Sequence, residues 1–245
     1  MYKLGLLGRN ISYSFSRGYF ENKFKNENIG GVSYENFDID HIEKFPELIE
    51  NIKGLKGLNV TIPYKEKVLP YLDKLNKTAK AIGAVNTIKV TKTGKLVGYN
   101  TDCHGFIESI KPLLLPHHDK ALILGTGGAS KAVVYSLITI GISCHYVSRT
   151  AGTTVKHTYD NLSHAIIKDY PIIINCTPLG THPNIQDCPN IPYDGITNKH
   201  ILFDLIYNPE ETTFLKFGKQ KGAIIKNGLD MLKLQAEKAW EIWNV

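Results

Sequence analysis

One stretch constrains this chain more than any other: residues 122–138, LILGTGGASKAVVYSLI, in which an apolar run meets a cluster of glycines and continues into a helix-compatible segment. Glycines directly after a strand let the backbone turn sharply and approach a ligand closely. The N-terminus of the helix that follows offers unpaired N–H groups and a positive dipole end to a phosphate. The pattern therefore predicts a strand, a tight turn and a helix, with a nucleotide site at the turn.

The glycine pattern departs from the dinucleotide fingerprint G-x-G-x-x-G at one position. Gly125 and Gly127 occupy the first two positions, Gly128 and Ala129 follow, and Ser130 stands at the third. A glycine turn alone is weak evidence, because a strand and a helix can also meet through such a turn for structural reasons only. Both interpretations stay open until other residues are brought in.

Length and composition indicate a globular protein of two domains. The 245 residues suffice for two domains, at about 100–200 residues each, and 42% apolar with 21% charged residues is typical of a chain that buries a core. There is no run of about 20 apolar residues that could span a membrane, and the opening MYKLGLLGRN is too short an apolar run for a signal peptide. We expect a cytoplasmic protein with no membrane partner.

Several function classes receive no support from the sequence. The four cysteines show no C-x-x-C pair and no regular spacing with histidine, so neither a disulfide framework nor a zinc site is indicated. His117, His118 and Asp119 are adjacent on a polar stretch, which is typical of a surface connection, and no metal is predicted. The net charge of +6 comes from scattered lysines and does not indicate nucleic-acid binding.

The first part of the chain alternates between strand-like and helix-like segments. Strands are expected over 3–8, 33–39 and 58–62, and helices over the run that stops at Gly30, over 41–54 and over 73–82. Lys65 follows Pro63 and is expected on a short helix. Residues 85–99 are typical of a β-hairpin that turns at residues 92–94.

The later part repeats the β–α alternation with nearly continuous apolar strands, which favours a parallel sheet covered on both faces. Beyond the glycine turn, strands are expected over 143–147, 171–176, 200–207 and 223–226, and helices over 107–115, 211–222 and 229–243. We predict an α/β protein in which residues 1–103 and 227–245 form a substrate-binding domain and 104–226 a Rossmann-type domain. The active site is expected in the cleft between them.

Cofactor choice is usually read at the end of the strand after the glycine turn, where an acidic residue binds the ribose hydroxyls of NAD and an arginine accommodates the 2′-phosphate of NADP. Here that strand ends in Ser148, Arg149 and Thr150, with no acid. A guanidinium can bind a phosphate in a bidentate manner. An ordinary surface arginine is the alternative, but together with the glycine turn the residues favour NADP.

Lys65 and Asp102 are ambiguous when taken alone. Most lysines after a strand face water, and Asp102 in the sequence NTD is a plausible helix N-cap. Both lie among short polar residues at expected strand ends, which supply hydrogen-bonding groups without net charge for a polyhydroxylated substrate: Asn59, Thr61, Asn86, Asn100 and Thr101.

Nine motifs in order extend these signals over essentially the whole length: YSFS, NVTIPYK, GAVNT, NTD, GTGGAS, SRT, NCTPLG, DLIY and NGLDMLKLQA. In these motifs the chain resembles the shikimate dehydrogenases. The resemblance implies reversible NADPH-dependent reduction of 3-dehydroshikimate to shikimate, in the pathway to the aromatic amino acids. It implies an α/β fold with an N-terminal substrate domain, a Rossmann-type NADP domain and a C-terminal helix that returns to the first domain.

The resemblance also implies roles for individual residues. Lys65 and Asp102 are the expected catalytic pair. The expected substrate-binding residues are Ser14, Ser16, Asn59, Thr61, Asn86, Tyr207 and Gln235. The expected cofactor-binding residues are Gly125, Gly127, Gly128, Ala129, Ser148, Arg149, Thr150, Thr177, Leu205 and Gly228. The expected partner is a small molecule, with no nucleic acid, and the chain is expected to be a monomer or a homodimer.

The implied chemistry agrees with the residue types. Hydride transfer to a ketone leaves a developing alkoxide, which needs a proton donor such as the Lys65 ammonium. An ionised Asp102 beside it would hold the ammonium form, and the two groups would titrate as a coupled pair.

The chain departs from the family pattern at Arg17, at Cys103 and in the loop after Arg149, where Thr153 replaces a second arginine and Lys156 is a possible substitute. A quinate/shikimate dehydrogenase that uses NAD, and a non-catalytic sensor of a small acid or nucleotide, are the alternatives.

Overall fold

The computed structural model describes residues 1–12 and 14–244, and these divide into two compact units. The first unit comprises Met1–Thr101 and Ala236–Val245, and the second comprises Asp102–Gln235. The sequence predicted that the first domain ends at residue 103 and resumes at residue 227. In the structure the first unit ends at residue 101 and resumes after residue 235. Tyr13, the first residue of the YSFS motif, lies outside the described residues. Within the described part of the chain, no helix is both long and apolar enough to cross a membrane.

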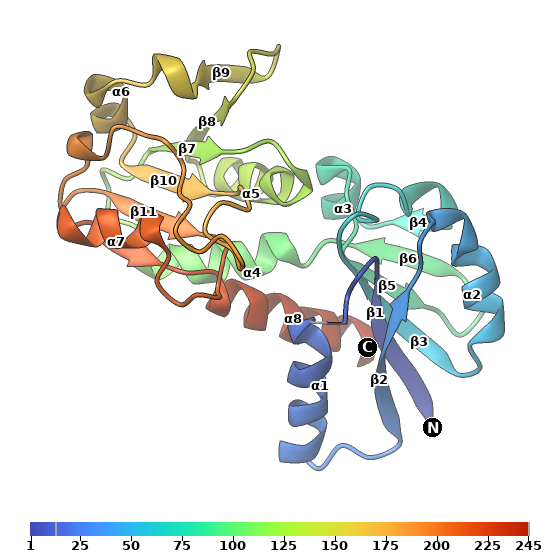
Figure 1. The fold of residues 1–245 in the computed structure, drawn as a ribbon. Coiled ribbons are helices and arrows are strands. Elements are labelled where there is room, and N and C mark those ends of the chain that lie inside the picture. The colour runs from blue at the N-terminus through green and yellow to red at the C-terminus, as the bar shows by residue number, and fades with distance from the viewer. Residues whose placement is uncertain (13, 245) are drawn as a thin grey trace. The chain divides into compact units, whose positions relative to one another are not determined.

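The first unit is built on a six-stranded mixed sheet in the order β2-β1-β3-β5-β6-β4 (Figure 1). Its strands are β1 (Tyr2–Gly8), β2 (Val32–Asp38), β3 (Leu55–Val60), β4 (Lys74–Leu75), β5 (Thr87–Val90) and β6 (Leu96–Tyr99). Its helices are α1 (Phe15–Asn26), α2 (Phe45–Asn51) and α3 (Lys77–Ile82), with the 3-10 turns η1 (Ile42–Lys44) and η2 (Leu69–Tyr71). The first three strands pair in parallel because α1 and α2 connect them, whereas β5 and β6 form the predicted antiparallel hairpin.

Two expectations for the first unit are wrong. Lys65 lies in a turn after β3, not on a helix, because the chain passes Pro63 and closes two successive turns before η2. The helix expected over 73–82 is confined to α3, since residues 74–75 add the short edge strand β4. Asn76 begins α3 by accepting a hydrogen bond from the N–H of Ala79, and Gly83 ends it in the left-handed conformation.

The second unit is a six-stranded sheet in which every strand pairs in parallel, in the order β12-β11-β10-β7-β8-β9. The strands are β7 (Lys120–Leu124), β8 (Ser143–Ser148), β9 (Val155–Thr158), β10 (Ile172–Asn175), β11 (Ile201–Asp204) and β12 (Ile224–Lys226). Numbered within the unit, this is the 3-2-1-4-5-6 order of a Rossmann fold. The predicted parallel sheet is confirmed, but β9 was missing from the prediction.

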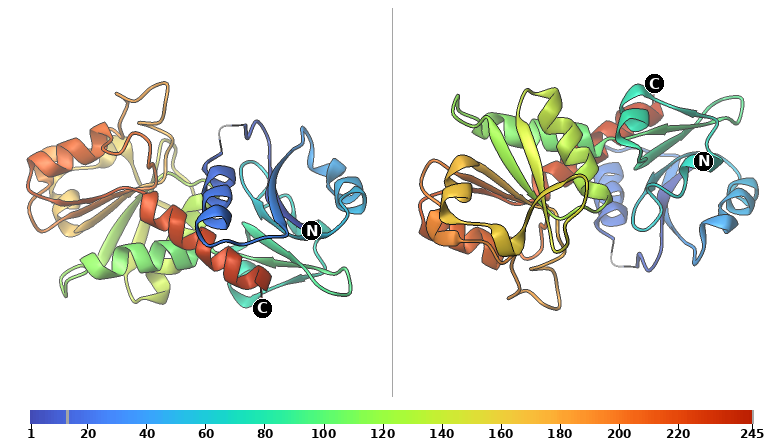
Figure 2. Two further views of the ribbon diagram at one scale, coloured as in Figure 1. Left: turned by 90° about the horizontal axis from the view of Figure 1, so that it is seen from below. Right: turned by 90° about the horizontal axis from the view of Figure 1, so that it is seen from above.

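Helices cover both faces of the second sheet: α4 (Asp102–Ile110), α5 (Gly128–Thr139), α6 (His164–Asp169), α7 (Thr213–Gln220) and the 3-10 turns η3 (Lys111–Leu113), η4 (Tyr159–Asn161) and η5 (Tyr193–Gly195). Alternate residues of β7 pack into different cores. Ala121 and Ile123 contact the core that includes α4 and α5, while Leu122 and Leu124 contact the core that includes α6 and α7. Figure 2 shows α4 and α5 on one face of this sheet and α7 on the other.

The closing helix α8 (Leu229–Asn244) is shared between the units. Met231 packs into the core of the second unit, whereas Ala236, Ala239 and Trp243 pack against α1 and β1 in the first. Trp243 donates a hydrogen bond to the carbonyl of Ile88 at 2.9 Å and lies where a Cβ on Gly57 would be. The predicted return of the C-terminal helix to the first domain is confirmed.

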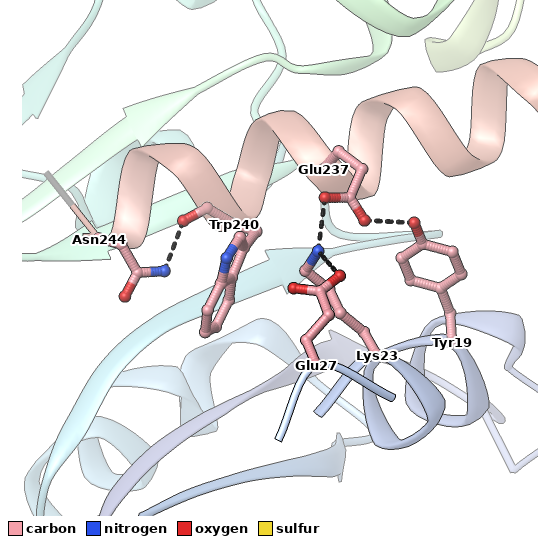
Figure 3. A network of polar contacts seen from close by, with 6 residues as sticks. All are labelled: Tyr19, Lys23, Glu27, Glu237, Trp240 and Asn244. Atoms are coloured by element: carbon pink, nitrogen blue, oxygen red, sulfur yellow. Dashed lines mark hydrogen bonds and ion pairs between the residues drawn. The ribbon is translucent and has the colours of Figure 1, made fainter. Parts of the chain in front are cut away.

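A polar network joins α8 to α1 within the first unit (Figure 3). The carboxylate of Glu237 accepts hydrogen bonds from the hydroxyl of Tyr19 and from the ammonium of Lys23, the latter at 2.8 Å. Lys23 also contacts Glu27 at 2.7 Å, and its side chain is only 9% exposed. The network therefore holds the end of α8 by partly buried, charge-assisted hydrogen bonds in addition to apolar packing.

Candidate functional site

The glycine turn between β7 and α5 has the geometry that a close ligand approach requires. Gly125 has a φ of +100°, and a Cβ at this position would come within 3.0 Å of the Thr177 side chain. Only glycine fits there without strain. Gly127 is the N-cap of α5, so the first N–H groups of a 12-residue helix have no intrahelical partner.

Ser130, at the third fingerprint position, explains why the imperfect pattern is tolerated. Its hydroxyl donates a hydrogen bond to the carbonyl of Gly127 at 2.6 Å, and the residue is fully buried. Ser130 therefore uses its hydroxyl within the first turn of α5, and it does not line the pocket as Gly125 and Gly127 do.

A pocket of about 350 Å³ lies beside this turn. It is lined by residues that follow β7, β8 and β10 and by one tyrosine: Gly125, Thr126, Gly127, Ser148, Arg149, Tyr159, Cys176, Thr177, Pro178 and Leu179. The strand order reverses between β7 and β10, and ligands of open parallel sheets bind outside the carboxyl ends of the strands at that point. None of the described residues that line the pocket is acidic, so an anionic ligand meets Arg149 without a competing carboxylate.

The structure brings half of the expected cofactor residues to this pocket. Gly125, Gly127, Ser148, Arg149 and Thr177 line it, and Gly128, Ala129, Thr150, Leu205 and Gly228 do not. Leu205 and Gly228 instead meet each other, because a Cβ on Gly228 would lie 2.2 Å from the carbonyl oxygen of Leu205. Gly128 and Ala129 form the first turn of α5.

Tyr159 is a pocket residue that the sequence did not reveal. It lies on η4, directly after the unpredicted strand β9, where no local pattern marks it as a ligand contact. Burial raises the pKa of its phenol to about 12, although the charge of Arg149 lowers it. Tyr159 therefore stays neutral and contributes an uncharged aromatic surface beside the guanidinium.

Lys156 does not stand in for the missing second arginine in this structure. Its ammonium donates a hydrogen bond to the hydroxyl of Tyr170 at 3.1 Å, and Tyr170 also contacts the imidazole of His145 at 3.2 Å. Thr153 is exposed. Arg149 is thus the one basic side chain among the described residues that line the pocket.

In the first unit, five buried uncharged polar side chains from β2, β3, the start of β5 and the segment after β6 meet the half-buried Ser16 of α1. Together they are called here the neutral cluster: Ser16, Tyr34, Asn59, Asn86, Thr87 and Thr101. Tyr34 donates to Oδ1 of Asn59 at 2.7 Å, and the hydroxyl of Ser16 hydrogen-bonds that of Tyr34. Nδ2 of Asn59 reaches Thr87 at 3.3 Å. Burial raises the pKa of Tyr34 far above its usual range, so the cluster remains neutral.

Asn86 ties this cluster to the residue before Asp102. Its Oδ1 accepts the backbone N–H of Thr101 at 2.7 Å, and its Nδ2 donates to the Thr101 hydroxyl at 3.0 Å. Tyr34 and Thr87 belong to the cluster but were not predicted, because on their strands they look like ordinary core positions. The sequence pointed to Ser16, Asn59, Asn86 and Thr101, and the structure brings these four together.

The two expected catalytic residues belong to different units. Lys65 lies in the turn after β3, where its carbonyl accepts the N–H of Val85 at 2.7 Å. Asp102 is the first residue of α4 and is 7% exposed.

The remaining expected substrate residues are also placed on both units. Ser14 is the N-cap of α1 and accepts the N–H of Ser16 at 3.2 Å. The N–H of Thr61, just beyond β3, donates to the carbonyl of Leu7 at 2.9 Å. Tyr207 follows β11, and Gln235 is buried on α8, both within the second unit.

A second polar group, buried except for the half-buried Thr177, lies at the carboxyl ends of β10 and β11 and is called here the Asp204 cluster. It consists of Asp204, Asn175, Thr177 and Thr212. Asn175 and Asp204 are paired in register, and both are 0% exposed. Asp204 accepts hydrogen bonds from Nδ2 of Asn175 at 3.1 Å, from the N–H of Ile206 at 3.0 Å and from the hydroxyl of Thr212 at 2.6 Å. Burial nevertheless raises its pKa to about 6.

No group of three or more His, Cys, Asp or Glu side chains within residues 1–12 and 14–244 could hold a metal ion. His117 and His118 each place Nε2 against the carbonyl of Lys199, at 3.2 and 3.1 Å. The adjacent histidines thus join two loops of the second unit.

Comparison with known proteins agrees with this geometry. Residues 6–88 match the model of the shikimate dehydrogenase substrate binding domain. The shikimate dehydrogenase (NADP(+)) of Clostridium beijerinckii is 43% identical, over 98% of this chain and 90% of the relative. The solved shikimate dehydrogenase of Aquifex aeolicus is 35% identical, with a TM-score of 0.87 over 100% of this chain and 92% of that one.

A shikimate dehydrogenase of Thermus thermophilus, solved in complex with NADP(H) and shikimate, is 29% identical, with a TM-score of 0.87 over 99% of this chain and 93% of that chain. The similarity therefore extends over both units and over nearly the whole length of the relatives. The chain belongs to the shikimate dehydrogenase family.

Proposed function

We propose that this chain catalyses the reversible NADPH-dependent reduction of 3-dehydroshikimate to shikimate. The observation that carries the proposal is the pocket at the carboxyl ends of β7, β8 and β10, bordered by a glycine turn and Arg149, in a chain 43% identical to an NADP(+)-dependent shikimate dehydrogenase. NADPH supplies the hydride, and the chain's own residues bind the cofactor and the substrate and move the proton.

Cofactor binding is assigned to the second unit. The helix N-terminus after Gly127 accepts the pyrophosphate, and Arg149 with Ser148 and Thr150 binds the 2′-phosphate, since a guanidinium forms strong charge-assisted hydrogen bonds to phosphate. Gly128, Ala129 and Thr177 border the same cofactor. Leu205 and Gly228, which contact each other, are assigned to the same cofactor from the family resemblance.

Proton transfer is assigned to Lys65 and Asp102. In the reductive direction the Lys65 ammonium donates a proton to the oxygen that gains charge as hydride reaches the carbonyl carbon. In the oxidative direction the same pair accepts the hydroxyl proton of shikimate.

Substrate recognition is assigned to uncharged side chains that can match several hydroxyls of a polyhydroxylated acid: Ser14, Ser16, Asn59, Thr61, Asn86, Tyr207 and Gln235. The support is the neutral cluster, which orients Ser16, Asn59 and Asn86 through hydrogen bonds to Tyr34, Thr87 and Thr101. A fixed orientation matters because an amide that could rotate would lose part of its discrimination between substrate hydroxyls.

The test is a comparison of initial rates with two acids and two cofactors. We expect kcat/KM to be highest for shikimate with NADP, and the rate with quinate and NAD to be lower by at least an order of magnitude. Preferential oxidation of quinate with NAD would overturn the proposal, and no oxidation of either acid would favour a binding protein.

A second candidate, a dehydrogenase with substantial NAD use, is favoured by one observation. Arg149 is the one basic side chain among the described residues that line the pocket, and Lys156 is bonded to Tyr170. We therefore expect a smaller preference for NADP over NAD than two basic residues would provide. The ratio of kcat/KM for NADP and NAD with shikimate measures it.

We also propose a cytoplasmic location and a monomeric or homodimeric state. The location is supported by Cys103, Cys144, Cys176 and Cys188, none of which forms a disulfide within the described residues, as is usual for proteins of a reducing compartment. Sedimentation of the purified chain would decide the oligomeric state.

A further inference from the structure

The Asp204 cluster does more than fill the end of the second sheet, because it borders the pocket. Asn175 is the last residue of β10, and the next four residues, 176–179, form one wall of the pocket. Asp204 is the last residue of β11 and lies beside Asn175. The buried carboxylate of Asp204 therefore contacts Asn175, the residue directly before the segment that a cofactor would contact.

Asn175 holds that wall at three points. Its Oδ1 accepts hydrogen bonds from the N–H of Thr177 at 3.0 Å and from the Thr177 hydroxyl at 2.6 Å. Its Nδ2 donates to the carbonyl of Leu179 at 3.3 Å and to Asp204 at 3.1 Å. All four hydrogen-bonding positions of the amide are used, so its orientation is determined.

Asp204 is the charged contact among those that select this orientation, alongside the Thr177 N–H and the Leu179 carbonyl. An ionised carboxylate accepts hydrogen bonds and donates none, so it requires the NH₂ side of the Asn175 amide to face it. The carbonyl side must then face Thr177. With the amide reversed, the Asn175 carbonyl would point at Asp204, and the two N–H donors would point at the Thr177 N–H.

The orientation determines what Thr177 can offer to a ligand. The Thr177 hydroxyl donates its hydrogen to Asn175 and accepts a hydrogen bond from the N–H of Leu179 at 3.3 Å. A hydroxyl has one donor and two acceptor positions. Thr177 consequently retains one acceptor position, which suits a donor on the ligand such as a ribose hydroxyl or a carboxamide N–H.

The charge of Asp204 has no basic partner among the described residues. The titratable groups that interact with it are Cys176 and Tyr193, whose pKa values burial raises so that both stay neutral. On neighbouring elements, Lys226 of β12 binds Asp230, and Glu211 before α7 binds Lys219. Asp204 is thus held by hydrogen bonds alone, and keeping it ionised is costly.

We infer that Asp204 is a positioning residue for the cofactor: through Asn175 it holds residues 176–179 in the form that borders the pocket and leaves Thr177 as a hydrogen-bond acceptor. The inference rests on the proposed function. Hydrogen bonds to an ionised acceptor are stronger than those to a neutral one. Protonation of Asp204 therefore loosens the segment, and cofactor affinity falls as the pH drops through the range near 6 in which this carboxyl titrates.

The experiment compares the wild type with Asp204→Asn, which keeps the shape and removes the charge. We expect Kd for NADP, measured by calorimetry, to be roughly tenfold higher in the variant at pH 7.5, and the ratio to approach one at pH 5. The 2′-phosphate of NADP also titrates near pH 6, but it contributes equally to both proteins and cancels in the ratio. NADPH should behave like NADP⁺.

The matched control is Asp194→Asn. Asp194 is a surface residue of the same unit, bound to Lys221 at 2.6 Å, and its removal should leave Kd for NADP unchanged. A second readout separates positioning from damage to the fold. Because Asp204→Asn removes a buried charge, the variant should unfold at a higher urea concentration than the wild type at pH 7.5 while binding NADP less tightly.

Equal Kd values for the wild type and Asp204→Asn at every pH would overturn the inference. So would a ratio that does not change with pH, or opposite responses of NADP⁺ and NADPH, which would indicate a direct action of the charge on the nicotinamide ring. Should the variant fail to fold, the wild-type profile decides, since Kd for NAD, which lacks the 2′-phosphate, must still rise below pH 6. Absence of NADP binding by the wild type would instead refute the proposed function.

Discussion

The neutral cluster of the first unit and the Asp204 cluster of the second solve the same problem with different chemistry. Each is largely buried, and each orients an asparagine, Asn86 in one and Asn175 in the other. The first uses hydroxyls and amides only, whereas the second relies on a carboxylate whose pKa burial raises to about 6.

The difference indicates what each unit can tolerate. Neutral groups that satisfy one another cost little to bury, and their arrangement does not change between pH 5 and 8. A buried carboxylate costs more and titrates near neutrality, but it forces the neighbouring amide into one orientation. We therefore expect the affinity for the cofactor to change with pH near 6, whereas the affinity for the substrate should not change over the same range.

The largest expected effect concerns Lys65, which lies in the first unit, whereas the pocket assigned to the cofactor lies in the second. Lys65→Ala should lower kcat for shikimate oxidation by about 10²–10⁴-fold, because general acid–base catalysis is worth that much. Kd for NADP should stay near the wild-type value. Lys67→Ala, an exposed lysine of the same turn, serves as the control. Unchanged turnover would remove Lys65 from the mechanism and favour a sensor.

The pH dependence of the free energy of unfolding tests the Asp204 cluster, the charged one of the two clusters. The pKa of Asp204 is raised from 3.8 to about 6 in the folded protein. As the pH rises, Asp204 therefore ionises in the unfolded chain before it ionises in the folded one. The contribution of Asp204 to the free energy of unfolding should therefore fall by roughly 2 kcal/mol between pH 4 and pH 6.5, out of about 3 kcal/mol over the whole titration, and change little above pH 7. Urea unfolding of the wild type and Asp204→Asn measures the difference, and parallel curves would contradict the prediction.

The neutral cluster should respond without pH dependence. Asn86→Ala leaves the buried N–H of Thr101 without its acceptor, and an unsatisfied buried donor costs about 1–3 kcal/mol of unfolding free energy. The loss should be the same at pH 5 and pH 8. Asn244→Ala, which removes an exposed amide from the end of α8, should change stability by less than about 0.5 kcal/mol. A loss confined to one end of the pH range would show that the cluster carries charge.

Arg149 tests cofactor choice within the second unit. Arg149→Ala should weaken NADPH binding more than NADH binding by about 1–3 kcal/mol, because a charge-assisted contact to the 2′-phosphate is lost. Fluorescence titration with both cofactors measures the difference. Lys156→Ala should leave the preference unchanged, since Lys156 is bonded to Tyr170. Equal weakening of both cofactors by Arg149→Ala would mean that this residue does not bind the 2′-phosphate.

The smallest expected effect concerns the attachment of α8 to α1. Tyr19→Phe removes the hydrogen bond to Glu237 but keeps the ring and leaves Lys23 bound to the same carboxylate (Figure 3). The loss should be about 1 kcal/mol in urea unfolding, the usual worth of one partly buried hydrogen bond. A loss of several kcal/mol would mean that Tyr19, and not the apolar packing of Trp243, holds the helix.

Much of the fold could be predicted because local patterns determine local structure. Alternation predicted β2, and the turn at 92–94 predicted the β5–β6 hairpin. The return of α8 to the first domain was predicted by the resemblance to the shikimate dehydrogenases. The prediction failed where local signals were weak. The edge strand β9, VKHT, carries a half-exposed polar sequence, and Lys65 was assigned to a helix where the chain only turns.

The sequence by itself determined the backbone at the glycine turn, the absence of an acid after β8 and the order of motifs that identifies the family, because these depend on neighbouring residues and on residue types. Only the tertiary structure decided which distant side chains meet. Asn175 and Asp204 are 29 residues apart, and Tyr34 and Asn59 are 25 apart. Their burial and partners follow from strand pairing and packing, and burial in turn sets the charge of Asp204, which a single position in a sequence does not encode.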